Sequence, residues 1–129
     1  MWNWRKRIAA KYTEAFKDLD TIELHTIKED RESSWHLYPI RLHLDRLKKT
    51  RAQMIDELRK NNIGVGVHFM PVHQHLYYNE TFKLSDDNFP VASNVFPRLM
   101  SLPIYPGMKD SHVDRVINVL IDLLKKHKK

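Results

Sequence analysis

The sequence predicts an α+β fold in which three to four helices pack on a small, mainly antiparallel sheet of three to four strands. Two stretches near the ends of the chain repeat apolar residues every three or four positions, as amphipathic helices do. A stretch in the first half alternates apolar with polar residues, as a strand does. With 129 residues the chain has room for one core of ordinary size, so we expect residues 1–129 to form a single domain.

The first predicted helix begins almost at Met1, where only Asn3 is a candidate capping residue. Its apolar face consists of Trp4, Ile8, Tyr12, Ala15, Phe16 and Leu19. A loosely alternating segment, residues 21–28, follows the helix and leads into a polar loop.

The clearest strand lies within residues 34–44. Its alternating faces carry Ile40, Leu42 and Leu44 on one side and Arg41 and His43 on the other. Pro39 would remove a ladder hydrogen bond from a central strand, so we expect this strand to lie at an edge or to be bulged near its start. Residues 63–69 are predicted as a second strand, and residues 99–102 as a third.

The remaining helices have recognisable boundaries. Thr50 and Gln53 have the spacing of a capping box, which predicts a helix of about ten residues that stops at Asn61. Residues 91–98 form a short helix candidate between two prolines. The last helix is expected from Asp110 or Ser111, with an apolar face made of Val113, Val116, Ile117, Leu120 and Leu124.

Composition excludes several classes of function. The chain has no cysteine, which excludes disulfides and thiolate zinc sites and is compatible with a cytoplasmic location. No apolar run approaches the roughly 20 residues that span a bilayer, and no secretory signal is visible, so we expect no membrane association. The net charge of +6 raises the alternative of nucleic-acid binding, but no recognised module accompanies the charge, and we expect none. Only three glycines are present, and none forms a phosphate-binding loop before a helix.

The densest group of functional side chains is the segment from His68 to His75, where a predicted strand runs into a loop broken by Pro71. His68, His73 and His75 could supply three imidazole metal ligands, but their spacing matches no standard zinc signature and no carboxylate is close in sequence. The alternative is that these imidazoles form local hydrogen bonds or line a pocket, and we expect no metal site. The aromatic residues that follow are predicted to lie in a loop and to cover a core edge or an interface, and the Asp86–Asp87 pair to be solvated.

Four segments, in this order, resemble the DegT/DnrJ/EryC1/StrS sugar aminotransferases. They are residues 5–12 (RKRIAAKY), 33–38 (SSWHLY), 64–73 (GVGVHFMPVH) and 101–108 (SLPIYPGM). The resemblance is to the C-terminal part of these enzymes and covers essentially the whole chain. It implies the small α+β domain of a fold-type-I, pyridoxal-phosphate-dependent enzyme.

The resemblance also implies where the chemistry lies. In the family, the Schiff-base lysine and most cofactor contacts belong to a large domain that precedes this one and is absent from the chain. We therefore expect no catalytic residue and no bound cofactor here, although pyridoxal phosphate serves the intact enzyme. The substrate-facing residues that the resemblance implies are His68, Phe69, Met70, His73 and Tyr77.

The leading hypothesis is that the chain is the C-terminal domain, or a truncated form, of an enzyme that transfers an amino group from glutamate to a ketosugar nucleotide in polysaccharide or deoxysugar biosynthesis. Such a chain would be inactive alone and would require the missing large domain or a homodimer partner. The alternative is a stand-alone binding or dimerisation module that retains the fold. Trp2 and Trp4 motivate this alternative, because a helix face that lost its partner would stay apolar.

Overall fold

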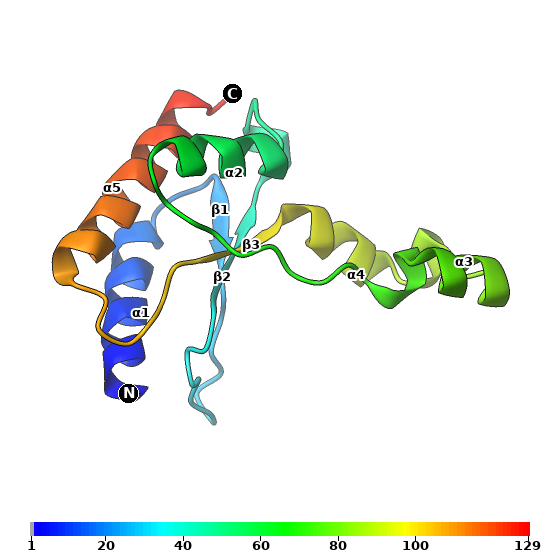
Figure 1. Cartoon of the computed structure of the whole chain (residues 1–129), viewed down its shortest axis with the longest axis horizontal. Helices are drawn as coiled ribbons and strands as arrows, with labels where there is room; N and C mark the ends of the chain where they lie inside the picture. Colours follow the sequence, from blue (N-terminus) through cyan, green and yellow to red (C-terminus); the bar gives the residue numbers. More distant parts are fainter. Residues whose placement is uncertain (1) are drawn as a thin grey trace.

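The computed structural model describes residues 2–129, and within them the chain forms an antiparallel three-stranded sheet with the order β1-β2-β3 (Figure 1). The strands are β1 (Ile22–Leu24), β2 (Tyr38–Leu42) and β3 (Leu99–Leu102). Ile22 pairs with Leu42, and Ile40 pairs with Met100. The predicted fold class is confirmed, and β3 has the bounds predicted for it.

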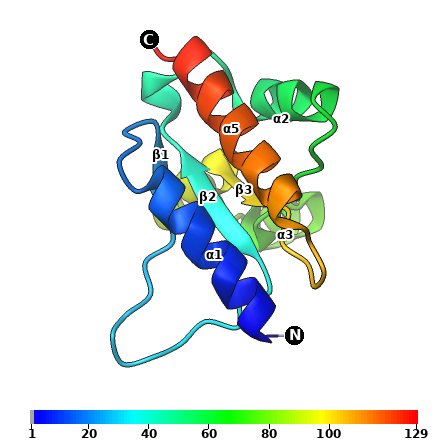
Figure 2. The same ribbon diagram turned by 90° about the vertical axis from the view of Figure 1, so that its left-hand side faces the viewer.

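Helices α1 (Trp2–Phe16) and α5 (Asp110–Lys126) lie side by side across one face of the sheet (Figures 1 and 2). Both bury the faces that their apolar spacing predicts, except that Trp4, one turn before Ile8, is 44% exposed. Between the helices and the sheet lies the core, whose fully buried large side chains include Tyr12, Phe16, Tyr38, Ile40, Leu42, Met100, Leu120 and Leu124. None of the helices within residues 2–129 is both long and apolar enough to cross a bilayer.

Helix α2 (Arg51–Lys60) confirms the predicted capping box. The Thr50 hydroxyl accepts a hydrogen bond from the Gln53 backbone N–H, and the Gln53 side chain accepts one from the Thr50 N–H. These bonds satisfy two backbone donors that a helix start would otherwise leave free. The helix ends at the Asn61 cap, as predicted.

The prediction that the strand containing Pro39 lies at an edge is wrong, because β2 is the central strand. The proline is tolerated there because β1 is short. The last β1 pair is Leu24 with Ile40, so at Pro39 only β3 lies alongside, through Ser101. Pro39 is therefore at a local edge within a central strand.

The predicted strand over residues 63–69 is also wrong as a regular element. Only Gly66 pairs, in an isolated antiparallel bridge with Ser101 whose two backbone hydrogen bonds are 2.9 Å long. The segment thus runs beside β3 and is held at one point, before Pro71 turns the chain away.

Residues 67–98, called the arm below, extend from the side of the sheet opposite α1 and α5 (Figure 1). The arm contains α3 (Leu76–Phe82), α4 (Pro90–Val95) and three single turns of 3₁₀-helix, η2 (Val72–Gln74), η3 (Asp86–Asn88) and η4 (Phe96–Arg98). Helix α4 with η4 confirms the helix predicted over 91–98. Helix α3 was not predicted, and it brings the α-helices within residues 2–129 to five.

Candidate functional site

His68 lies where the chain leaves the sheet and enters the arm. Its Nε2 is 2.9 Å from the hydroxyl oxygen of Ser101 on β3, and the ring is half-buried. The same Ser101 holds Gly66 through two backbone hydrogen bonds. The imidazole is therefore hydrogen-bonded to the sheet two residues after the backbone bridge at Gly66, and such support helps a binding group to meet a ligand in one geometry.

Phe69 and Met70 follow directly and are presented to solvent. The Phe69 side chain is 99% exposed and that of Met70 is 41% exposed. Burying an aromatic side chain of this size against a partner stabilises a contact by about 25 cal/mol for each Å² removed from water. Phe69 and Met70 thus form an exposed apolar surface next to the His68 imidazole, and this surface is available for contact with a partner.

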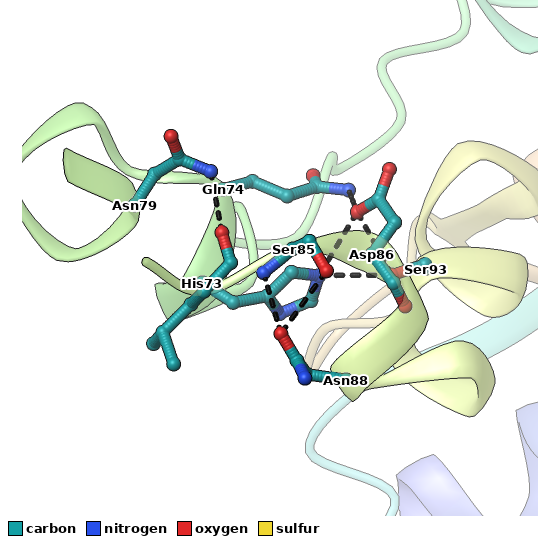
Figure 3. Close-up of polar contacts among 8 residues, drawn as sticks. His73, Gln74, Asn79, Ser85, Asp86, Asn88 and Ser93 are labelled. Carbon is teal, nitrogen blue, oxygen red and sulfur yellow. Dashed lines mark hydrogen bonds and ion pairs between the residues drawn. The ribbon is translucent and has the colours of Figure 1, made fainter. Parts of the chain in front are cut away.

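His73 is placed differently, because its side chain is buried within the arm (Figure 3). Its Nε2 lies 3.1 Å from Asp86 Oδ1 and 2.8 Å from the Ser93 hydroxyl oxygen. The Phe89 ring stacks on the imidazole, with ring centroids 4.8 Å apart. In this conformation the Nε2 atom of His73 faces the protein.

Tyr77 lies on α3, and its ring is 66% exposed. It meets Tyr78 and Phe82 edge to face, with centroids 5.4 and 6.4 Å apart, and Tyr78 stacks on Phe82. The prediction that these aromatics occupy a loop is wrong, since they form one exposed cluster on a helix.

Asp86, which is predicted to be solvated, is exposed but also accepts hydrogen bonds from other side chains of the arm. Its Oδ1 accepts hydrogen bonds from Gln74 Nε2 at 2.8 Å and from the Ser93 hydroxyl at 2.9 Å. These two bonds, with a smaller contribution from His73, hold the pKa of the Asp86 carboxyl below its usual range. Sequence reasoning did not connect Asp86, Ser93 or Ser101 with these histidines, because each meets its histidine across at least 13 residues of chain.

Two hollows of the surface are lined by other residues than these. A hollow of about 150 Å³ between the sheet and α4 is lined by His25, Pro39, Arg41, Val95 and Leu99. A larger one, of about 500 Å³, lies between residues 62–64, the loop after β3 and α5, and its lining includes Tyr105, His112 and Arg115. Within residues 2–129, no three His, Asp or Glu side chains are grouped so that they could hold a metal ion.

Comparison of the sequence with known proteins identifies the family of this chain. The sequence model of the DegT/DnrJ/EryC1/StrS aminotransferase family matches residues 1–121. The chain belongs to this family. It is 45% identical over 116 residues to MJ1066 from Methanocaldococcus jannaschii, covering 90% of this chain and 30% of that protein. It is 38% identical over 122 residues to SpsC, a spore coat polysaccharide biosynthesis protein of Bacillus subtilis, covering 94% of this chain and 31% of SpsC.

Solved structures agree in fold. Spr1654 from Streptococcus pneumoniae, which is named as a sugar aminotransferase, aligns in its PLP form with a TM-score of 0.85 and 28% identity. The alignment covers 98% of this chain and 32% of Spr1654. PseC from Helicobacter pylori, an aminotransferase involved in the biosynthesis of pseudoaminic acid, aligns with a TM-score of 0.86 and 23% identity over 97% of this chain and 33% of its own. The chain thus spans about a third of the length of its relatives.

Proposed function

We propose that this chain is the C-terminal small domain of a pyridoxal-phosphate-dependent nucleotide-sugar aminotransferase and supplies one wall of its substrate site. The reaction would transfer an amino group from glutamate to a ketosugar nucleotide, in polysaccharide or deoxysugar biosynthesis. The single observation that carries the proposal is the fixed imidazole of His68 beside the exposed Phe69, in a chain that matches only a third of each relative. A cytoplasmic location belongs to the same proposal and is compatible with the absence of cysteine.

The chemistry of these side chains suits a sugar. An imidazole can donate or accept a hydrogen bond with a hydroxyl, and the face of an aromatic ring covers the apolar C–H face of a pyranose. We assign substrate contact to His68, Phe69, Met70 and Tyr77, whose side chains are at least partly exposed. A direct contact by the buried His73 stays a prediction.

The residues present do not fit the cofactor. A Schiff-base lysine needs an enclosed setting that desolvates its amine. None of the lysines within residues 2–129 is buried, and no lysine lines either hollow described above. We infer that the groups that bind and activate pyridoxal phosphate belong to the part of the enzyme that this chain lacks, and that the chain alone is inactive.

The arm also indicates a missing partner. Ten of its large apolar side chains are exposed, among them Phe69, Leu76 and Val91, which is more than an isolated surface usually carries in one segment. In the intact enzyme these side chains would pack on the large domain or on a second subunit. The same exposure, together with that of Trp2 and Trp4 on α1, favours the alternative, a stand-alone binding or dimerisation module that retains the fold.

A composite enzyme tests the proposal. In it, this chain replaces the matching segment of SpsC, and amino transfer from glutamate to a panel of ketosugar nucleotides is measured beside intact SpsC. We expect activity in the composite, and none in the isolated chain supplied with pyridoxal phosphate. Transamination by the isolated chain would overturn the assignment of the chemistry to the missing part.

Sedimentation velocity separates the two candidates. The small-domain proposal expects the isolated chain to be a monomer, or to self-associate weakly and without a fixed stoichiometry. A stable homodimer, together with an inactive composite, would favour the stand-alone module.

A further inference from the structure

The arm has almost no core of its own. Within residues 67–98, all of which the structure describes, His73 is the only buried residue, and it is 4% exposed. A segment of this length normally holds its shape by burying apolar side chains. Polar contacts therefore take a larger part in holding the arm, and several of them meet at His73 and Asp86.

Three elements of the arm meet at this imidazole (Figure 3). His73 lies on η2, Asp86 on η3 and Ser93 on α4. Besides the bonds to His73, the Ser93 hydroxyl oxygen lies 2.9 Å from Asp86 Oδ1 and 3.3 Å from the Asp86 backbone oxygen. The segments before and after α3, residues 67–75 and 83–98, are the two limbs of the arm. They are joined by mutual polar contacts among His73, Asp86 and Ser93.

Counting protons fixes the direction of each bond. The Asp86 carboxylate only accepts, and it accepts from Gln74 and from Ser93. Ser93 has one hydroxyl proton, so once it donates to Asp86 it must accept from His73. His73 Nε2 therefore carries a hydrogen, which is shared between the Ser93 hydroxyl oxygen and Asp86 Oδ1.

The carboxylate is set in place independently of the histidine. Ser85 and Asn88 form a capping box around η3, in which the Ser85 backbone N–H donates to Asn88 Oδ1 at 2.8 Å. This box holds the turn that carries Asp86 through contacts that do not involve His73.

We propose that His73 is a positioning residue whose Nε2–H, shared by Ser93 and Asp86, latches the two limbs of the arm and so holds the Phe69–Met70 segment in its substrate-facing position. The inference rests on the proposed function of that segment. This role does not require His73 to touch the substrate, because it acts through the chain between Met70 and η2. Loss of the latch frees the arm but leaves the core between α1, α5 and the sheet intact.

Two variants of the isolated chain separate the latch from simple packing. His73→Phe keeps an aromatic ring for stacking on Phe89 but has no donor, and Asp86→Ala removes the exposed acceptor at no risk to the core. We expect hydrogen exchange of the α3 and α4 amides to accelerate about tenfold in both, the order that one charge-assisted hydrogen bond supports. Exchange in α1 and α5 should not change. Asp87→Ala, which alters the neighbouring carboxylate of the same turn, is the matched control.

A spectroscopic signature and a rescue complete the test. Nitrogen-15 shifts of the His73 ring should show the Nε2–H tautomer, and His73→Gln, whose side-chain amide can replace the donor, should restore most of the protection. In the composite enzyme, Asp86→Ala should raise the KM for the ketosugar nucleotide about tenfold with little change in kcat.

Each contrary result would overturn a different part of the proposal. Unchanged exchange in both variants, or an Nδ1–H tautomer, would overturn the latch whatever the composite does. An active composite whose KM is the same with and without Asp86→Ala would overturn the link between latch and substrate. An inactive wild-type composite would instead count against the proposed function, while the exchange data would still decide the latch.

Discussion

The Nε2 atom of His68 lies 2.9 Å from the hydroxyl oxygen of Ser101, a buried side chain on β3. This bond ties the candidate substrate site to the three-stranded sheet. Ser101 pairs with Pro39 in the register of β2 and β3. This register therefore places the partner of the His68 imidazole at the base of the arm.

Replacing Ser101 with Ala should free the His68 ring and lower stability modestly. We expect a loss of about 1 kcal/mol in the free energy of unfolding, because one hydrogen bond is lost and its histidine partner can still reach water. Urea denaturation measures the loss, and the nitrogen-15 shift of His68 Nε2 reports the change in its partner. Ser34→Ala, in an exposed loop, should change neither.

Phe69→Ser should affect function and leave the fold unchanged. A side chain that is 99% exposed contributes little to stability, so the free energy of unfolding should change by less than about 0.5 kcal/mol. In the composite enzyme the KM for the ketosugar nucleotide should rise. Leu37→Ser, another exposed apolar side chain outside the arm, serves as the control. An unaltered KM would remove Phe69 from the substrate site.

The capping box of α2 should be measurable as a stability contribution. Thr50→Ala removes the hydroxyl that accepts from the Gln53 N–H, and we expect a loss of about 1 kcal/mol. Thr50→Ser keeps that hydroxyl and should recover most of the loss, whereas Thr26→Ala in an exposed loop should be neutral. Equal stabilities of the Ala and Ser variants would show that the box contributes nothing.

Alkaline pH should destabilise the chain through Tyr12. Burial raises the pKa of this phenol above its usual value near 10, with smaller contributions from Tyr105 and Tyr38. Because the neutral phenol is favoured in the folded state, its contribution is complete below pH 10 and declines as pH rises toward the folded pKa. Tyr12→Phe, which also loses the hydrogen bond to the Pro103 carbonyl oxygen, should be less stable at neutral pH and lose less stability between pH 10 and 12. Parallel pH profiles of the two proteins would contradict this account.

Local patterns were sufficient to predict the elements whose residues pack on the core. The 3.6-residue spacing of Val113, Val116, Ile117 and Leu120 predicts α5, and the Thr50–Gln53 spacing predicts the start of α2. Helix α3 could not be predicted this way. It has seven residues, its N-cap His75 makes no capping hydrogen bond, and none of its side chains is buried, so it has neither a core-facing side nor a start signal.

The substrate-facing residues stay a prediction, and the sequence did not distinguish the contacts of His68 from those of His73. The segment from His68 to His73 is recognisable as a motif, whereas the bonds that distinguish the two histidines depend on partners that are distant in sequence. Ser101 is 33 residues from His68, and Ser93 is 20 residues from His73. The place of Pro39 could not be predicted for a similar reason. A proline is tolerated in the central strand because β1 ends at the Leu24–Ile40 pair, and the length of β1 is not visible in the sequence around Pro39.

The central claim is that this chain supplies the substrate-facing small domain of a sugar aminotransferase and depends on the absent part for its chemistry. The most direct measurement is the rate of amino transfer by the composite with SpsC, compared with SpsC that lacks its matching segment and with this chain alone. The account predicts activity in the composite and none in the two separate parts. A composite that folds and binds pyridoxal phosphate but transfers no amino group to the ketosugar nucleotide would contradict it.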